Sequence, residues 1–196
     1  METRPPAHAI ERAAKTIEDW SCGQRASQGF YIPYRYAAST HNAGAPPWLL
    51  NKLHDAGAQM DDWLDAARAL NGDLARYATA NAGKPHNPRF DQEWFTGLDA
   101  TLAYTMVREL APSRIIEVGS GHSTRFMARA IEDGGLRTSF TSIDPEPRRD
   151  IDTLCTTVER RPLDVDALPV FDQLMSGDIL FIDGSHILMP GTDVEF

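Results

Sequence analysis

The sequence predicts an α/β fold built on a doubly wound parallel sheet and preceded by a helical N-terminal region. Three short strand-like stretches support this prediction: residues 114–118, 138–144 and 178–183 each resemble a strand that carries an acidic residue at or near its end. Parallel strands are buried on both faces, and ligands of such sheets bind beyond the carboxyl ends of the strands. The acidic residues therefore mark a candidate binding site.

The first strand is predicted over residues 114–118, and a turn containing Gly119 and Gly121 follows it. Glycine adopts backbone angles that other residues avoid, and it allows a ligand to approach the main chain closely. Ser123 or Thr124 is expected to cap the helix that comes next. The inward stripe of this helix would consist of Phe126, Met127, Ala130 and Ile131. A strand, a glycine turn and a helix N-terminus in this order are typical of a nucleotide-sized ligand site.

The spacing within the turn separates two ligand classes. The dinucleotide fingerprint requires a third glycine three residues after the second, and Thr124 stands there instead. Two positions before the first glycine is Glu117, a carboxylate that we expect to be buried. A buried carboxylate is costly without a partner, and a cationic ligand such as the amino group of a methionine moiety would supply one. The alternative is an ordinary strand–turn–helix unit with a capping serine and no ligand.

The second strand is predicted over residues 138–144 and ends in Asp144. This aspartate follows Gly121 by 23 residues, close to the spacing of about 20 for the acid that binds ribose hydroxyls in dinucleotide sites. A carboxylate accepts two hydrogen bonds from a vicinal diol, as in the ribose of adenosine. Alternatively, Asp144 caps a helix that Pro145 and Pro147 would introduce, and the two roles are compatible.

Two further strands complete the predicted sheet. A third is expected around residues 157–161, with Asp164 just beyond it. The fourth contains four consecutive apolar residues, 179–182, and is therefore expected to be covered on both faces. It ends in Asp183 and Gly184, and His186 follows two residues later.

These segments together resemble the class I S-adenosylmethionine-dependent methyltransferases, whose first motif is acid-x-Gly-x-Gly-x-Gly. Ser123 stands where the third glycine of the motif usually lies, and it is small enough to fit. The sequence Asp183-Gly184-x-His186 is similar to the subgroup with Ile-Asp-Gly-x-His after the fourth strand. The resemblance covers roughly residues 95–196 and implies a Rossmann-like sheet with the strand order 3-2-1-4.

The resemblance implies transfer of a methyl group from S-adenosylmethionine to a small-molecule acceptor, most simply to an oxygen atom. The residues expected to bind this cofactor are Glu117, Gly119, Ser120, Gly121, Ser123, Asp144, Asp164 and Asp183. Asp164 would accept a hydrogen bond from the adenine amino group, although a solvated loop aspartate fits the sequence equally well. Two other classes remain as alternatives: a non-catalytic cofactor-binding module and, less well supported, a nicotinamide-dependent oxidoreductase.

Two residues near the fourth strand have more than one expected role. An acceptor hydroxyl must lose its proton, and His186 is the candidate base because an imidazole titrates near neutral pH. Its alternative role is to cap or support neighbouring groups. Asp183 would hold the methionine end of the cofactor or ligate a divalent cation, and no metal site is assigned. His122, inside the glycine turn, is expected to contact the cofactor or to pack.

Composition limits the partners of the protein. The formal net charge of −9 argues against nucleic acid and against anionic membrane surfaces. No apolar run is long enough to span a bilayer, and no secretory leader opens the chain. Cys22 and Cys155 form no metal or redox pattern, so a cytoplasmic location is the simplest expectation.

Residues 1–95 are predicted to form a helical cap region, and residues 96–196 the cofactor-binding domain. Helices are expected over residues 7–20 and 47–80, with interruptions near Gly57 and Asn71-Gly72, and a further helix over residues 98–110. The aromatic residues of the cap region are expected in its core. Their alternative role is to bind the acceptor, with Tyr31, Tyr34 and Trp94 as candidates.

The family that this chain resembles has a seven-stranded sheet, whereas the sequence ends about ten residues after the fourth predicted strand. The cofactor domain is therefore expected to be incomplete at its C-terminus. An apolar fourth strand at the edge of a sheet is a template for unwanted pairing unless something covers it. A homo-oligomer or a partner chain would cover this edge.

Overall fold

The computed structural model describes Tyr36, Ser39 and residues 44–78, 86–147, 150–187 and 189–195. The chain divides into two compact units, Met1–Lys52 and Leu53–Phe196. In the first unit, the amide and hydroxyl of Ser39 both donate to the carbonyl of Tyr36 and form a turn. The helix predicted over residues 7–20 lies outside the described residues, and a domain boundary after residue 95 stays a prediction.

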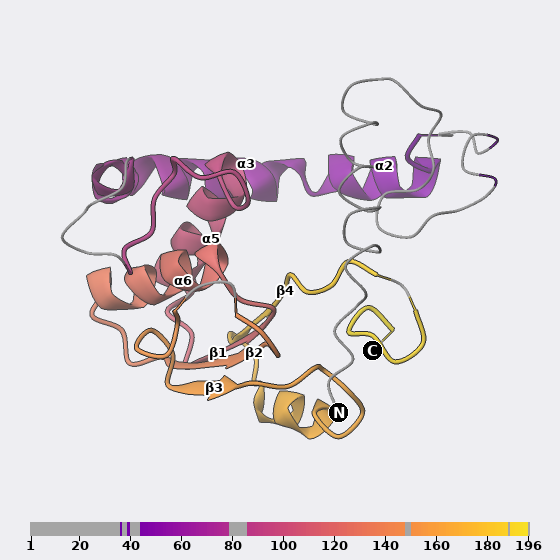
Figure 1. Ribbon diagram of the computed structural model, residues 1–196. Helices are drawn as coiled ribbons and strands as arrows, with labels where there is room; N and C mark the ends of the chain where they lie inside the picture. Colours follow the sequence, from indigo (N-terminus) through magenta and orange to yellow (C-terminus); the bar gives the residue numbers. More distant parts are fainter. Residues whose placement is uncertain are drawn as a thin grey trace, which may run out of the picture. The chain divides into compact units, whose positions relative to one another are not determined.

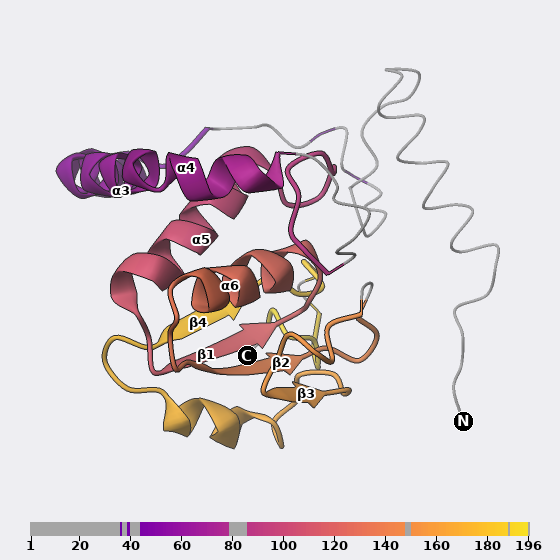
Figure 2. The same ribbon diagram turned by 90° about the vertical axis from the view of Figure 1, so that its left-hand side faces the viewer.

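The second unit contains a sheet of four parallel strands in the order β3-β2-β1-β4 (Figure 1 and Figure 2). The strands are β1 (Arg114–Val118), β2 (Ser139–Ile143), β3 (Thr157–Glu159) and β4 (Ile179–Ile182). All three strand pairings are parallel, and β1 pairs with both β2 and β4. The predicted α/β, Rossmann-like fold with the strand order 3-2-1-4 is thus confirmed.

The central strand β1 is buried on both faces. Ile115 belongs to the core cluster beneath the two main helices, whereas Val118 packs on the other face with Leu163 and Ala167. Ile116, between them in sequence, is fully buried. Such a strand must be almost wholly apolar, and Glu117 is the exception, with no exposed surface at all.

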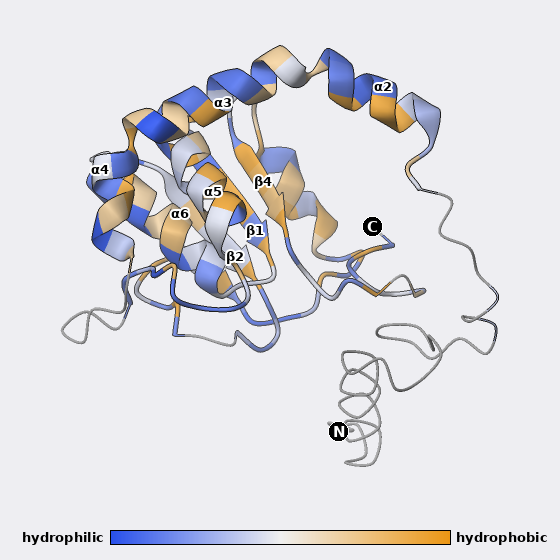
Figure 3. Cartoon of the chain, turned by 90° about the horizontal axis from the view of Figure 1, so that it is seen from above, coloured by the Kyte–Doolittle hydropathy of each residue, from blue (hydrophilic) through white to orange (hydrophobic). Residues whose placement is uncertain are grey.

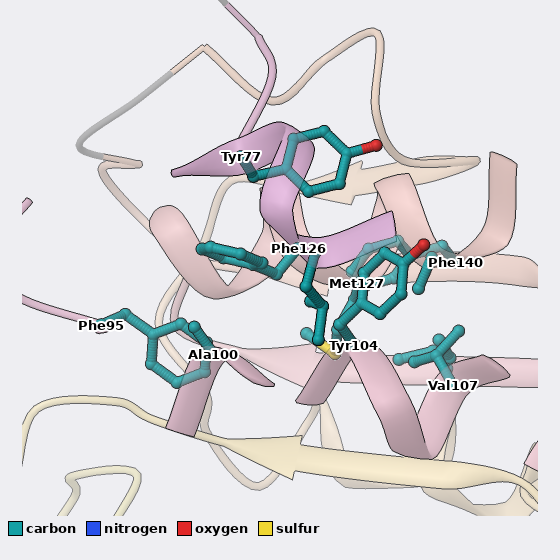
Figure 4. Close-up of a cluster of buried hydrophobic side chains, with 11 residues drawn as sticks. Tyr77, Phe95, Ala100, Tyr104, Val107, Phe126, Met127 and Phe140 are labelled. Carbon is teal, nitrogen blue, oxygen red and sulfur yellow. The ribbon is translucent and has the colours of Figure 1, made fainter. Parts of the chain in front are cut away.

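Helices α5 (Gly97–Leu110) and α6 (His122–Asp133) cover one face of the sheet, and a short helical segment, η3 (Leu168–Gln173), lies on the other (Figure 2). The aromatic and aliphatic side chains between the helices and the sheet form the main core (Figure 4). The predicted inward stripe of α6 is confirmed, because Phe126, Met127 and Ala130 are buried and Ile131 packs against the same cluster. The helix predicted over residues 98–110 is confirmed as α5.

The beginning of α6 differs from the prediction. The helix starts at His122, so Gly121 occupies the N-cap position and neither Ser123 nor Thr124 does. Both hydroxyl residues lie within the first turn, where the Thr124 hydroxyl accepts a hydrogen bond from the Gly121 amide at 2.9 Å. The expected N-cap position is therefore wrong, because the helix begins two residues before Ser123 could cap it, and Thr124 instead bonds back to the N-cap amide from the first turn.

The N-terminal helical segments are α2 (Pro47–Asp55), α3 (Gly57–Ala69), α4 (Asn71–Leu74) and the short η2 (Ala75–Tyr77). The interruptions fall at Ala56 and Leu70, next to the predicted break points. Helix α3 packs against α5. The expectation that the aromatic residues of this region are all core residues is wrong for Trp48 and Trp94, which are 63% and 74% exposed. Tyr31 and Tyr34 lie outside the described residues.

A polar network joins the end of η2 to helices α5 and α6. The hydroxyls of Tyr77 and Tyr104 both donate to Oδ2 of Asp133, at 2.6 and 2.8 Å. Arg129 lies 3.1 Å from the other carboxylate oxygen, and Arg76 donates to Oδ2 at 3.1 Å. Burial alone would raise the pKa of Asp133, but the two tyrosine hydrogen bonds and the two arginines lower it below its ordinary value. The network therefore fixes α6 against η2 and α5.

Strand β4 is an edge strand with one poorly covered face. Ile179 and Phe181 pack against the main core, whereas Leu180 and Ile182 are 44% and 59% exposed. Figure 3 shows β4 as an apolar strand at the side of the sheet. The expectation of burial on both faces is wrong for this strand, because the described segment that covers the second face packs on Val118 of β1.

Candidate functional site

The carboxyl ends of β1, β2 and β4 bring three predicted site segments together. In the sheet register, Val118 pairs with Ile143 on one side and with Ile182 on the other. The Gly119 amide donates to the Ile143 carbonyl at 2.9 Å, and the Asp183 amide donates to the Val118 carbonyl at 2.9 Å. The glycine turn therefore lies between the segments that begin with Asp144 and Asp183.

Gly119 is required by both backbone angle and space. Its φ is +81°, and a Cβ at this position would lie 2.1 Å from the carbonyl oxygen of Asp183. A contact this short with a neighbouring backbone cannot be relieved by moving a side chain. The glycine therefore allows the loop after β4 to approach the end of β1. Gly121 is different, because a Cβ there would meet nothing within 4 Å.

Glu117 is the buried acid of the site. Its two carboxylate oxygens accept hydrogen bonds from the hydroxyls of Ser123 and Thr124, each at 2.6 Å. Burial raises the pKa of Glu117 to about 8; the two hydroxyls oppose this shift, and the nearby carboxylates of Asp144 and Asp183 add to it. The side chain is therefore largely protonated at neutral pH. The chain itself supplies its hydrogen-bond partners, a function of Thr124 that the sequence analysis missed.

Asp144 closes the glycine turn. Its Oδ2 accepts from the backbone amide of Ser120 at 2.8 Å and from the Ser120 hydroxyl at 2.7 Å. Its Oδ1 accepts from the amide of Glu146 at 2.8 Å. The described residues 144–147 and 150–156 form bends and turns, so the helix expected after Pro145 and Pro147 is absent from them. Asp144 therefore closes two local turns instead of capping a helix among these residues. Ribose binding stays a prediction.

The segment after β4 brings His186 and Asp183 together. The Nε2 atom of His186 lies 3.1 Å from Oδ1 of Asp183. Further along, Asp193 turns back and its carboxylate accepts from the amide and the hydroxyl of Ser185. A Cβ on Gly184 would lie 1.7 Å from Oδ2 of Asp193. The Asp193 carboxylate therefore lies against the backbone of Gly184, where a side chain would displace it, and the sequence analysis assigned no function to Asp193.

Asp164 has local partners in the turn that precedes η3. Its Oδ1 accepts from the amides of Asp166 and Ala167, both at 3.1 Å, and lies 3.7 Å from Arg161. These contacts favour the loop-aspartate alternative without deciding the adenine role. His122 is buried at the start of α6. Ser142, paired with Glu117 across the sheet, is also fully buried, and sequence reasoning missed it because a serine within a strand carries no distinguishing signal.

Comparisons of the chain with protein-family models, with curated proteins and with solved structures find no match. Within the described ranges, no group of three or more His, Cys, Asp or Glu side chains is arranged to hold a metal ion. The same part of the chain contains no helix with the length and apolar character needed to cross a bilayer. The fold defines the chain as an α/β protein with a Rossmann-like parallel sheet.

Proposed function

We propose that this protein binds S-adenosylmethionine and transfers its methyl group to a small-molecule acceptor, as an O-methyltransferase. The observation that carries the proposal is the convergence of Glu117, Asp144 and Asp183 around one glycine turn at the carboxyl ends of three parallel strands. Parallel α/β sheets bind their ligands at this position. Three acidic residues around the turn favour a ligand that carries positive charge.

The residues of the turn suit the groups of this cofactor. A ligand ammonium or sulfonium near Glu117 would stabilise the ionised form of a carboxyl whose pKa burial has raised to about 8. Asp144 already accepts three hydrogen bonds, from the Ser120 amide and hydroxyl through Oδ2 and from the Glu146 amide through Oδ1. A carboxylate has about four acceptor sites, so Asp144 can still accept from one ribose hydroxyl. Gly121 has open space where a side chain would stand, which favours close approach of a ligand to the backbone.

When bound, S-adenosylmethionine would supply an electrophilic methyl group on a sulfonium. The protein would contribute by holding the acceptor oxygen in line with that methyl, since alignment supplies most of the rate in such a displacement. His186 would remove the acceptor proton. Asp183 and Glu117 would keep the positive end of the cofactor on the β1–β4 side of the turn.

The test is a competition experiment on the purified chain. S-adenosylhomocysteine is titrated by calorimetry alone and in the presence of NAD, with Asp144→Ala as the weakened variant and Asp65→Ala, far along helix α3, as the matched control. We expect S-adenosylhomocysteine to bind and NAD not to displace it. Displacement by NAD, or binding of NAD alone, would overturn the proposal in favour of the oxidoreductase alternative.

A second candidate is a cofactor-binding module without turnover. It is favoured by the exposed apolar residues Leu180 and Ile182 on β4, since an acceptor pocket beside an uncovered strand would lack a wall. Incubation with labelled S-adenosylmethionine and a panel of hydroxylated acceptors separates the two functions. Tight cofactor binding without any labelled product would favour the module.

A further inference from the structure

We propose that Asp183 is a positioning residue for His186: its carboxylate selects the ring tautomer and orientation that allow the imidazole to take a proton from the acceptor. This inference rests on the proposed function for the identity of the reaction. It goes beyond that function by giving Asp183 a role toward a residue of the chain rather than toward the cofactor or a cation.

The geometry of the pair carries the proposal. Oδ1 of Asp183 lies 3.1 Å from Nε2 of His186, which is hydrogen-bonding distance. An ionised carboxylate accepts hydrogen bonds and donates none, so a hydrogen bond between these two atoms places the ring proton on Nε2. Protonation of Nε2 in the neutral ring leaves the basic lone pair on the other nitrogen, Nδ1.

Backbone contacts between Asp183 and the end of β1 fix the location of the pair beside the glycine turn. The Asp183 amide is bonded to the Val118 carbonyl, and the Asp183 carbonyl oxygen occupies the space that a Cβ of Gly119 would need. Asp183 is therefore attached to the end of β1, beside the proposed cofactor site. A second carboxylate oxygen, Oδ2, allows Asp183 to contact the cofactor as well, so the two roles are compatible.

Hydrogen bonds stabilise the loop that contains His186. The Asp193 carboxylate holds both the amide and the hydroxyl of Ser185, directly before His186. The Thr192 hydroxyl donates to the carbonyl of Ile187 at 2.6 Å, directly after it. His186 itself has a φ of +57°, an unusual angle for a residue with a side chain. These contacts fix the backbone on both sides of His186.

Acidic groups lie near the pair. Asp193 belongs to the same loop, and Asp183 is close enough to Glu117 to raise the pKa of that carboxyl. Because the pair is half exposed, at 55% and 40% for the two side chains, its contribution to folding is small. In this proposal the pair instead orients the imidazole ring of His186.

In the proposed step, the acceptor O–H bond breaks and its proton passes to Nδ1 of His186. The acceptor oxygen would form the new bond to the methyl carbon, and the electron pair of the broken carbon–sulfur bond would remain on the departing sulfur. The imidazolium would keep its Nε2–H oriented toward Asp183 and later release the Nδ1 proton to water.

The first test needs no turnover and no variant. Nitrogen-15 NMR of the imidazole rings in the wild-type chain, above neutral pH, reports which ring nitrogen carries the proton. We expect His186 to be held as the Nε2–H tautomer. The exposed His54 serves as an internal reference in the same spectrum, because its Nδ1 atom, rather than Nε2, lies near a carboxylate, 3.8 Å from Asp55. A predominantly Nδ1–H tautomer at His186 would overturn the proposal.

The second test uses variants and separates this inference from the proposed function. In Asp183→Ala, the tautomer preference of His186 should be lost, whereas Asp164→Ala should leave it unchanged. Where turnover is measurable, Asp183→Asn should lower kcat roughly 10- to 100-fold with an unchanged KM for the acceptor. An unchanged tautomer in Asp183→Ala would overturn the proposal, whereas failure to bind S-adenosylhomocysteine would overturn the proposed function alone.

Discussion

Gly119 and Asp183 meet at the ends of neighbouring strands, so closely that a Cβ on Gly119 would lie 2.1 Å from the carbonyl oxygen of Asp183. The two residues are far apart in sequence, and strands β1 and β4 bring them together. The glycine of the turn is therefore required by the fold of the free protein, before any ligand is considered. This changes how substitutions in the turn should be interpreted.

The two glycines of the turn should respond differently to substitution. Gly119→Ala is expected to destabilise the protein by about 2–5 kcal/mol, because the Cβ meets a backbone oxygen and φ is left-handed. Gly121→Ala is expected to change stability by less than about 1 kcal/mol, since nothing lies within 4 Å. Urea denaturation of both variants measures the contrast. Gly119→Val, with a larger and branched side chain, should additionally abolish cofactor binding.

Equal and small effects on stability at the two positions would mean that the loop after β4 does not approach the turn in solution. If Gly121→Ala weakens S-adenosylhomocysteine without changing stability, the open space at Gly121 belongs to the ligand site.

Glu117 should make stability depend on pH. Its pKa is raised from the ordinary value to about 8, so the folded state binds a proton more tightly than the unfolded state. Stability should therefore fall as pH rises from about 4.5 to about 8 and level off above, with a total change on the order of 3–5 kcal/mol. Glu117→Gln keeps the size and hydrogen bonds of the side chain and should remove this decline. Denaturation midpoints of both proteins at pH 6 and pH 9 test it.

The same carboxyl predicts proton release when a cationic ligand binds. A positive group near Glu117 lowers its pKa, so binding at pH 7 should release a fraction of a proton. Calorimetry in two buffers of different ionisation enthalpy measures this release. The release should disappear in Glu117→Gln, and persistence there would assign the proton to another group.

Asp144 should matter most to ligands with a ribose diol. Asp144→Ala is expected to weaken S-adenosylmethionine by about 1.5–3 kcal/mol, the scale of hydrogen bonds to a charged group. Because Asp144 also holds Ser120, Ser120→Ala serves as a control that removes one of the turn's own hydrogen bonds. Equal weakening of an analogue without the diol would show that Asp144 acts only by closing the turn.

Asp133 should be the most sensitive polar residue outside the site. Asp133→Asn removes the negative charge that Arg129 and Arg76 face, and both tyrosine hydroxyls still require acceptors. The free energy of unfolding is therefore expected to fall by about 3–5 kcal/mol. Because the pKa of Asp133 is lowered, its contribution is present above the ordinary aspartate range and is lost as pH falls through it. Asp65→Asn, at an exposed pair with Arg68, should change stability by less than about 0.5 kcal/mol.

His186 should affect transfer rather than binding. In protein that turns over, His186→Ala is expected to leave cofactor affinity intact and to slow transfer by roughly 10²–10⁴-fold, the usual contribution of a positioned base. A matched loss of S-adenosylhomocysteine affinity would place His186 in the cofactor site instead. Single-turnover kinetics with saturating cofactor distinguish the two outcomes.

The sequence by itself determined the elements and their order. Continuous apolar runs marked β1 and β4, the apolar spacing of Phe126, Met127 and Ala130 marked the buried face of α6, and the two glycines marked the turn between β1 and α6. These features depend on local periodicity and backbone preference, which are written in neighbouring residues. The acids were predictable as the residues at the ends of these strands. Their convergence was also predictable, because parallel strands of one sheet place their carboxyl ends together.

Only the tertiary structure decided what those acids contact. Whether Glu117 is held by Ser123 and Thr124 depends on the pitch at which α6 leaves the turn, and the approach of Asp183 to Gly119 depends on the register between β1 and β4. Likewise, the exposure of Leu180 and Ile182 follows from which strand the segment after β3 covers. Such contacts join residues distant in sequence, and no local pattern encodes the angle or the register that brings them within hydrogen-bonding distance.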